Sequence, residues 1–306
     1  MIECDKKSHN IDFSFVFMKK LSCTLSWIEH NLDKQITVST LTTITGWSHR
    51  YLGTLFNTAT GLSPAEYIRQ RKLTQAAFML RESSRSVTDI SLMYGFEYLN
   101  TFSRTFKCFF GKSPREYRKA DHWDMRIFCP SAIIKDIPCE VDYIHINETH
   151  FKFTQKSVIS LNYGVNFFVN VKNNQLYPEK DLNKIIMNFI FKNREKEDFL
   201  ICGETGPGEY CDTKINIYAG KLKRAASHER NIVQIFNGDY IRFLFTGSPS
   251  DVISYHSWAL GHGLHKHNAL LRRGPTFTQF KLTPTPDIYT CLYYIPCISE
   301  GSVLQT

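Results

Sequence analysis

The feature that most constrains this chain is an internal repeat of about 50 residues in its N-terminal third. The first block of the repeat returns 49 positions further on, where Val38, Leu41, Ile44, Gly46 and Trp47 are matched by Val87, Ile90, Met93, Gly95 and Phe96. The second block returns after 50 positions, where Phe56, Gly61, Ser63, Pro64, Glu66 and Tyr67 are matched by Phe106, Gly111, Ser113, Pro114, Glu116 and Tyr117. So many matches favour a duplicated structural unit over two unrelated segments.

Each unit is predicted to form two short amphipathic helices with a glycine between them. In the second unit, Val87, Ile90 and Met93 have the spacing of one helical face. Gly95 follows where that helix would end, because glycine readily takes a positive φ. The next helix would turn a row of phenylalanines inward and leave Asn100, Thr101, Arg104 and Lys107 on its other face. This pattern predicts a DNA-binding helix-turn-helix, whose second helix enters the major groove.

The motif Ser-Pro-x-Glu closes each unit and predicts a further helix start. Serine caps the helix, proline takes its first position, and glutamate at the third position completes a capping box. Residues 64–82 therefore predict one long helix that joins the two units, with Ile68, Ala76 and Leu80 buried. Upstream, the apolar stripe Leu21, Leu25, Ile28 and Leu32 predicts a helix from about 19 to 32, after a loosely ordered tail over 1–18.

The outward side chains of the second unit suit base recognition. Arg104 can pair bidentately with guanine, Asn100 can do so with adenine, and Thr101 can touch a thymine methyl or a phosphate. Two alternatives stay open from the sequence. Asn100 and Thr101 could cap their own helix, and Arg104 could pair with Glu97.

The segment GKSPREYRK, which follows YGFxxxxTFSRTFK, closely resembles the signature of the AraC/XylS transcription regulators. The resemblance covers about residues 26–119 and implies a bacterial activator that reads successive major-groove segments of double-stranded DNA and contacts RNA polymerase. It also implies that His49, Arg50 and Thr54 of the first unit meet DNA. Gly53 departs from the family pattern because it carries no side chain, so base recognition by the first unit is expected to be weaker.

Charge is concentrated in the same region. Residues 26–119 hold 13 Lys and Arg against 7 Asp and Glu, a net charge of +6, whereas the rest of the chain holds 24 against 22. Neutralising phosphates drives DNA affinity, so this excess suits a DNA-binding region.

The pattern changes to α+β after about residue 130. We expect strands at 141–146, 152–161, 215–218, 232–236, 240–245 and 291–295, with helices at 181–192 and from Ser248 to near Gly261. We therefore predict two domains, an all-α tandem helix-turn-helix domain at 19–122 and an α+β domain at 131–300.

The segments FNGDYIRFLFTG, LLRRGPTFTQF and YYIPC resemble a GyrI-like effector-binding domain, in the order found in Rob-like members of the family. The resemblance implies a cupped sheet that holds a small, often cationic effector between aromatic walls and a carboxylate. Tyr163, Phe167 and Trp258 are candidate walls and Glu204 is a candidate acid. Each could equally belong to the core or the surface.

Other motifs weigh against an enzyme. The nine cysteines of the chain form no CxxC pair. His262, His265 and His267 lack partners at metal-ligand spacing, so neither a metal nor a cofactor is expected. A DNA-repair enzyme of the alkyl-acceptor type remains an alternative, but Pro296-Cys297-Ile298-Ser299 lacks the histidine that would activate the thiol. Hydrolysis of a small molecule in the cup is a further alternative. No apolar run reaches membrane-spanning length and no signal peptide is evident, so we expect a cytoplasmic location.

Overall fold

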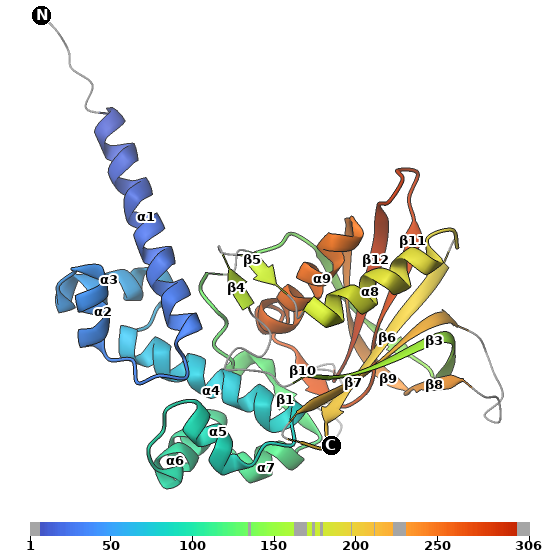
Figure 1. Ribbon diagram of the computed structural model, residues 1–306, viewed down its shortest axis with the longest axis horizontal. Helices are drawn as coiled ribbons and strands as arrows, with labels where there is room; N and C mark the ends of the chain where they lie inside the picture. The colour runs from blue at the N-terminus through green and yellow to red at the C-terminus, as the bar shows by residue number, and fades with distance from the viewer. Residues whose placement is uncertain are drawn as a thin grey trace, which may run out of the picture.

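The computed structural model describes residues 7–133, 136–161, 170–172, 175–177, 180–196, 198–210, 212–222 and 231–298. It has a helical N-terminal part and a C-terminal part built on an antiparallel sheet (Figure 1). The predicted combination of an all-α region and an α+β region is confirmed. No described helix is both long and apolar enough to cross a membrane.

The N-terminal part contains both predicted helix-turn-helix units. Its helices are α1 (Lys7–His30), α2 (Val38–Thr45), α3 (His49–Thr60), α4 (Pro64–Glu82), α5 (Val87–Met93), α6 (Leu99–Phe110) and α7 (Pro114–Lys119). Helix α1 begins at Lys7, so the expected tail over 1–18 is wrong for residues 7–18. Once a helix has formed, extending it costs little free energy, because each added residue contributes one hydrogen bond. A helix can therefore extend beyond the residues of its apolar stripe.

The serine caps form as the motif predicts, but only one of the two capping boxes is complete. Ser113 accepts a hydrogen bond from the Glu116 amide, and the Glu116 carboxylate accepts one from the Ser113 amide at 2.7 Å. Ser63 likewise accepts from the Glu66 amide. The Glu66 carboxylate instead bonds Gln70 at 2.8 Å and pairs with Arg69. Of the capping box predicted at Ser63, only the hydrogen bond to the serine side chain is present.

Helix α4 is the centre of the N-terminal core. Ile68, Ala76 and Leu80 are buried as predicted, and so is the α1 stripe from Leu21 to Leu32. All residues from 71 to 81 are buried, because α4 lies between the two helix-turn-helix units and also contacts the C-terminal sheet (Figure 1). A helix buried on all sides has no single apolar stripe, which is why its sequence shows a weak pattern.

The C-terminal sheet curls around an aromatic core, while α8 (Lys180–Asn193) and α9 (Pro249–Trp258) lie over its other face (Figure 1). Its main path runs β1-β10-β12-β11-β6-β7-β3-β8, and β9 joins β12 to β2. The strands are β1 (His122–Asp124), β2 (Glu140–Ile146), β3 (Thr149–Leu161), β6 (Asp198–Pro207), β7 (Thr213–Leu222), β8 (Ile232–Ile235), β9 (Gly238–Gly247), β10 (Leu270–Arg272), β11 (Thr276–Leu282) and β12 (Tyr289–Ile298). A separate hairpin pairs β4 (Asn170–Lys172) with β5 (Gln175–Tyr177).

The six strands and two helices expected in this part are present. The sequence did not indicate β6 and β11, two central strands of the sheet. Residues 199–202 of β6 are all buried, so the strand lacks the alternation of apolar and polar residues that marks a half-exposed strand. The second helix also runs past Gly261, through a π-helical turn at Ala259–Gly263 into α10 (Leu264–Lys266).

The two parts of the chain are in direct contact. Strand β1, which follows α7, pairs antiparallel with β10 and so adds to the C-terminal sheet. The Ser84 amide, just beyond α4, donates to the Asp212 carbonyl at 3.2 Å. The rings of Phe78 and Phe128 lie 4.9 Å apart between their centroids. The end of α4 is thus shared between the helical part and the sheet.

Candidate nucleic-acid interface

Helix α6 has one face for the core and another for solvent. Phe102, Phe106 and Phe110 are buried, and the ring of Tyr117 from α7 packs on Phe106 with 5.3 Å between centroids. The predicted contact residues of the second unit, Asn100, Thr101, Arg104 and Lys107, are all exposed. Their spacing places them along one side of the helix. Their contact with bases remains a prediction.

The structure bears on the two alternatives left open for α6. Its N-cap is Tyr98, so Asn100 and Thr101 lie within the first turn and do not cap it. The Glu97 carboxylate accepts a hydrogen bond from the Gln35 amide at 2.9 Å. Within the described part of the chain no ion pair joins it to Arg104. The Arg104 guanidinium is therefore exposed and available to a partner.

Helix α3 presents a sparser face. His49, Arg50 and Thr54 are exposed, as predicted. The Thr54 hydroxyl donates to the Arg50 carbonyl at 3.1 Å, so part of its hydrogen-bonding capacity is used within the helix. A Cβ atom placed on Gly53 would meet nothing within 4 Å, so open space lies beside it. The first unit thus offers fewer side chains that could reach a base edge.

The joining helix sets the spacing between the units. Helix α4 has 19 residues, which corresponds to about 28 Å at about 1.5 Å per residue. One turn of B-DNA measures roughly 34 Å, so a spacer of this length suits two helices in successive major-groove segments.

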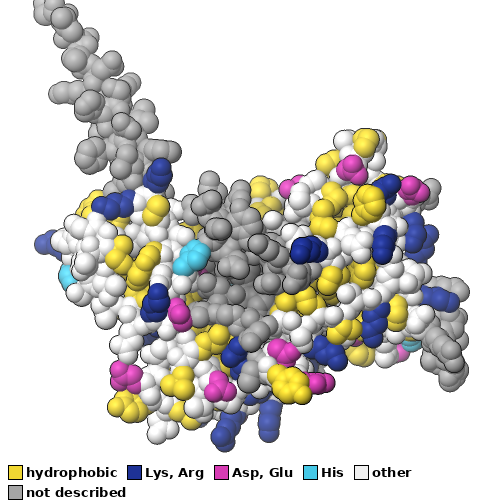
Figure 2. Space-filling view, viewed as in Figure 1, with side chains coloured by type: hydrophobic (Ala, Val, Ile, Leu, Met, Phe, Trp, Pro, Cys, Tyr) yellow, Lys and Arg dark blue, Asp and Glu magenta, His cyan; other side chains and the backbone are white. Residues whose placement is uncertain are grey.

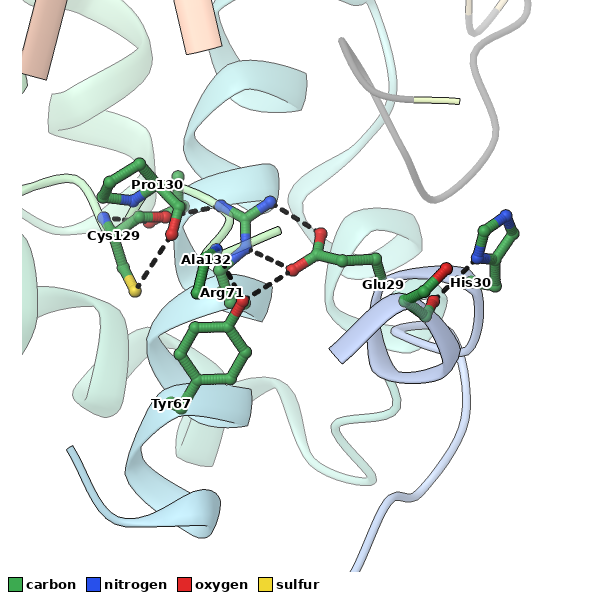
Figure 3. A network of polar contacts seen from close by, with 9 residues as sticks. Glu29, His30, Tyr67, Arg71, Cys129, Pro130 and Ala132 are labelled. Carbon is green, nitrogen blue, oxygen red and sulfur yellow. Dashed lines mark hydrogen bonds and ion pairs between the residues drawn. The ribbon is translucent and has the colours of Figure 1, made fainter. Parts of the chain in front are cut away.

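A buried polar network fastens α4 to α1 and to the segment after β1 (Figure 3). Arg71 donates through Nε and Nη2 to the two carboxylate oxygens of Glu29, each at 2.8 Å, and through Nη1 to the Cys129 carbonyl. The Tyr67 hydroxyl donates to Glu29 at 3.1 Å and accepts from the Ala132 amide at 3.1 Å. Burial alone would lower the pKa of Arg71, but the adjacent Glu29 carboxylate raises it above its usual value. Arg71 therefore stays charged in the core.

Lys72 ties the two units to each other. Its Nζ donates to the Lys34 carbonyl before α2 at 2.7 Å and to the Tyr94 carbonyl after α5 at 2.9 Å. Burial lowers the pKa of Lys72 to about 8. One side chain of α4 thus bridges the segment before the first helix-turn-helix unit and the turn of the second unit.

The structure adds basic residues that the sequence reasoning missed. A groove of about 700 Å³ lies beside Asn100, and Arg115 and Lys119 of α7 line it. Both side chains are exposed, and Figure 2 shows Lys and Arg side chains protruding at the edge of the molecule near α7. The sequence PREYRK contains these basic residues, but it predicted only a helix start and the family resemblance.

The predicted ligand residues of the C-terminal part do not form one described site. Tyr163 and Phe167 lie outside the described residues. Trp258, the last residue of α9, is fully buried and packs on Phe243, whereas Glu204 accepts a 3.1 Å hydrogen bond from Tyr218. Trp258 and Tyr218 belong to separate cores on the two faces of the sheet. Trp258 and Glu204 are thus not brought together, and their ligand roles stay predictions.

One aromatic side chain that was not among those expected, Tyr218, contacts Glu204. The ring of Tyr218 lies 4.8 Å from that of Phe153, and Lys156 Nζ lies 5.4 Å from the Tyr218 ring centroid. Burial, followed by the Glu204 carboxylate, raises the pKa of Tyr218 to about 12. Glu204 lies in β6, a strand that the sequence did not predict, so the face of the sheet to which it belongs could not be assigned from the sequence.

The three histidines near the end of α9 lie in different surroundings. His265 Nδ1 lies 3.0 Å from the Met125 carbonyl oxygen, and the His267 ring packs on Phe243. Burial lowers the pKa of His262. In the part of the chain that the structure describes, no three His, Cys, Asp or Glu side chains are placed to hold a metal ion.

Two helix-turn-helix units joined by one buried helix define a tandem helix-turn-helix DNA-binding protein. A family model described as "Helix-turn-helix domain" matches residues 41–120. The transcriptional regulator YkgA of Escherichia coli K12 is 40% identical over 117 residues, which cover 38% of this chain and 49% of YkgA. The multiple antibiotic resistance protein MarA of Salmonella typhimurium is 36% identical over 107 residues, 35% of this chain and 84% of MarA. The chain belongs to the AraC family of transcription regulators.

These relatives are informative only about the N-terminal part, where the family model matches residues 41–120. The chain spans about half of the length of YkgA. For the rest of the chain, the structure of SAV2435 bound to tetraphenylphosphonium aligns with a TM-score of 0.37 and 10% identity. It covers 52% of this chain and 93% of SAV2435. That likeness is too low to indicate a shared ligand.

Proposed function

We propose that this protein regulates transcription at specific promoters by placing α3 and α6 in successive major-groove segments, with α6 as the principal base-reading helix. The observation that carries the proposal is the exposed row Asn100, Thr101, Arg104 and Lys107 on a helix whose other face is anchored by three buried phenylalanines. An anchored helix presents its outer side chains in fixed positions, which sequence-specific contacts need.

The charge distribution supports the same proposal. Arg115 and Lys119 line the groove beside Asn100, so backbone contacts can accompany base contacts. His49, Arg50 and Thr54 on α3 would then serve mainly to position the protein on the second groove segment.

The family resemblance also suggests activation through contact with RNA polymerase, and an effector sensed by the C-terminal part. A part of the described sheet that suits a cationic effector is Glu204 with its partner Tyr218, against whose ring Phe153 packs. In vitro transcription from a bound promoter tests the activation directly. Activation should be lost when the operator is scrambled, and repression by the wild-type protein would contradict it.

The alkyl-acceptor enzyme alternative is disfavoured by the state of Cys297. This residue is buried, and burial, with the Asp239 charge adding to it, raises the pKa of the thiol to about 12. A thiol of this kind stays protonated near neutral pH, whereas the nucleophile in alkyl transfer is the thiolate. We therefore propose a regulator without catalytic activity.

The test is selection of DNA sites from a random library with the full-length protein, followed by affinity measurements at two salt concentrations. We expect an enriched site with two short conserved blocks about one helical turn apart and affinity that falls steeply with salt. Salt-dependent binding without any enriched sequence would refute specific promoter recognition.

A further inference from the structure

A cavity of about 210 Å³ lies between the end of α4 and the C-terminal sheet. Phe78, Arg81 and Glu82 line it from α4, Trp123 lines it from β1, and Arg273 from the segment after β10. The cavity is therefore enclosed by both parts of the chain. It is separate from the exposed face of α6 and from the surroundings of Glu204.

Arg81 is the unusual group in this cavity. Only 5% of the residue is exposed, and its guanidinium lies over the Trp123 ring with Cζ 3.3 Å from the centroid. Nη1 donates to the Tyr117 carbonyl at 3.2 Å and to the Ala120 carbonyl. Nε and Nη2 are buried and have no hydrogen-bond partner among the described residues. Buried donors without a partner are rare in native proteins, because each one forfeits its bonds to water.

The charge around Arg81 is positive. Arg272 and Arg273 also line the cavity, and both are held by backbone carbonyls, those of Cys297 and Arg118 among them. No described carboxylate lies within ion-pair distance of these three guanidinium groups. Burial, with Arg273 nearby, lowers the pKa of Arg81 to about 10, so it remains charged at neutral pH. Glu82 is the acidic lining residue; burial raises its pKa, and it accepts a hydrogen bond from Thr205.

The remaining walls are apolar, with Leu260, Leu264, Leu271, Tyr293 and Ile295 among them. Ligand pockets usually measure about 300–1,000 Å³, so this smaller cavity suits a compact ligand. The two unpartnered N–H groups, Nε and Nη2, form one edge of a planar guanidinium, and that edge matches the two oxygens of a carboxylate.

We propose that this cavity binds a small organic monocarboxylate with a compact apolar body, its carboxylate paired with Arg81 and its apolar part against Trp123, Leu260 and Leu271. The site would supply the regulator proposed above with an effector site that joins its two parts. Because Arg81 also holds the end of α7, occupancy would stabilise the second helix-turn-helix unit against α4. A ligand that favours this arrangement strengthens DNA binding, and DNA strengthens its binding equally.

The test is titration calorimetry of the full-length protein with phenylacetate, 4-methylpentanoate and cyclohexanecarboxylate, each paired with its neutral amide. We expect at least one acid to bind and its amide to bind at least tenfold more weakly. Equal binding of acid and amide, or no binding of any acid up to about 10 mM, would overturn the proposal.

Two variants locate the site. Arg81→Gln should weaken binding of the acid at least tenfold, but it also removes contacts to α7 and could unfold the domain. Leu260→Trp changes no charge at a partly exposed position, so it should fill the cavity and abolish binding while thermal unfolding stays near wild type. Unchanged acid binding in Leu260→Trp would place the ligand elsewhere and refute the assignment.

Operator affinity measured with and without the bound acid separates this inference from the proposed function. We expect a strengthening of at least fivefold in the wild type and none in Leu260→Trp. Acid binding by a protein that selects no DNA site would contradict the proposed function and leave the cavity assignment standing. Specific DNA binding that the bound acid does not alter would refute the coupling.

Discussion

Helices α3 and α6 are equivalent members of the two repeats, and their outer faces differ more than their inner faces. Both have 12 residues, both turn buried side chains toward α4, and both end at a glycine with φ near 70°, Gly61 and Gly111. Their outer faces have diverged. Where α6 presents Asn100, Thr101 and Arg104, α3 presents His49, Arg50 and Thr54 around Gly53.

The difference shows that packing and recognition make separate demands on a repeat. The inner face is constrained by its neighbours, since a change of even one methylene in a close-packed core has a cost. The outer face contacts only solvent in the free protein, so it can change without loss of the fold. The second repeat presents side chains suited to bases, whereas the first presents the same helix with fewer of them.

The two repeats also differ in how they are fastened to α4. Beside the first repeat, the buried ion pair between Glu29 and Arg71 holds α1, the helix before that repeat, to α4. The second is held by Arg81 and Arg118, whose guanidinium groups donate to backbone carbonyls and have no carboxylate partner in the described part of the chain. The first attachment is thus electrically balanced within the protein, whereas the second carries a buried positive charge.

The largest effect is expected from the attachment of the first repeat. Glu29→Gln leaves the Arg71 charge buried without its partner and should lower the free energy of unfolding by about 3–5 kcal/mol. Chemical denaturation measures the change, and Glu97→Gln at an exposed position should alter it by less than about 0.5 kcal/mol. A similarly small effect of Glu29→Gln would show that the pair does not support the fold.

The next effect concerns base recognition. Arg104→Ala should cost about 1–3 kcal/mol of binding and relax preference at one base pair, because it removes a side chain that can pair bidentately. Thr54→Ala should cost less and leave preference nearly unchanged, and Arg50→Ala shows whether Arg50 contacts a base or the backbone. Binding of the three variants to an operator library decides the ranking. If Thr54→Ala erased preference while Arg104→Ala preserved it, α3 would be the principal base-reading helix.

A smaller effect is expected at Gly53. Its backbone is helical and a Cβ meets open space, so Gly53→Ala should stabilise the protein by about 0.5–1 kcal/mol. Gly61→Ala is the matched control, because Gly61 has φ 72° and an alanine there would be strained. Thermal unfolding should therefore shift in opposite directions for the two variants. Destabilisation by Gly53→Ala would mean that this face is less open than the structure shows.

The last expected effect is a pH dependence from Lys72, which bridges the repeats. Its pKa is about 8 in the folded protein against 10.5 ordinarily, so between these values the unfolded chain binds more protons. Stability should therefore rise with pH above 8. Burial raises the pKa of Tyr94, which reverses the trend above about pH 10, where unfolded tyrosines ionise. Denaturation between about pH 8 and 9.5 should show the rise in wild type and a smaller one in Lys72→Met; equal slopes would contradict the assignment.

Much of the N-terminal part could be predicted because its signals are local. Helical spacing, serine caps and glycine ends act over a few residues, so the bounds of α4 and the inner and outer faces of α3 and α6 follow from the chain itself. Strand β6 could not be predicted, since burial of both its faces depends on elements distant in sequence. The same holds for Glu204, whose neighbours come from other strands.

The sequence by itself determined that this protein carries two helix-turn-helix units on a common helix, and which side chains α3 and α6 expose. Periodicity is a property of consecutive residues, and it requires no knowledge of the partner surface. Only the tertiary structure decided that α4 is buried on all sides from residue 71 to 81 and that Glu29 meets Arg71 across 42 positions. It also decided that Arg81 lines a cavity with two buried N–H groups that no described residue accepts. Those arrangements depend on which distant segments pack together, and packing between distant segments leaves no fixed spacing in the sequence.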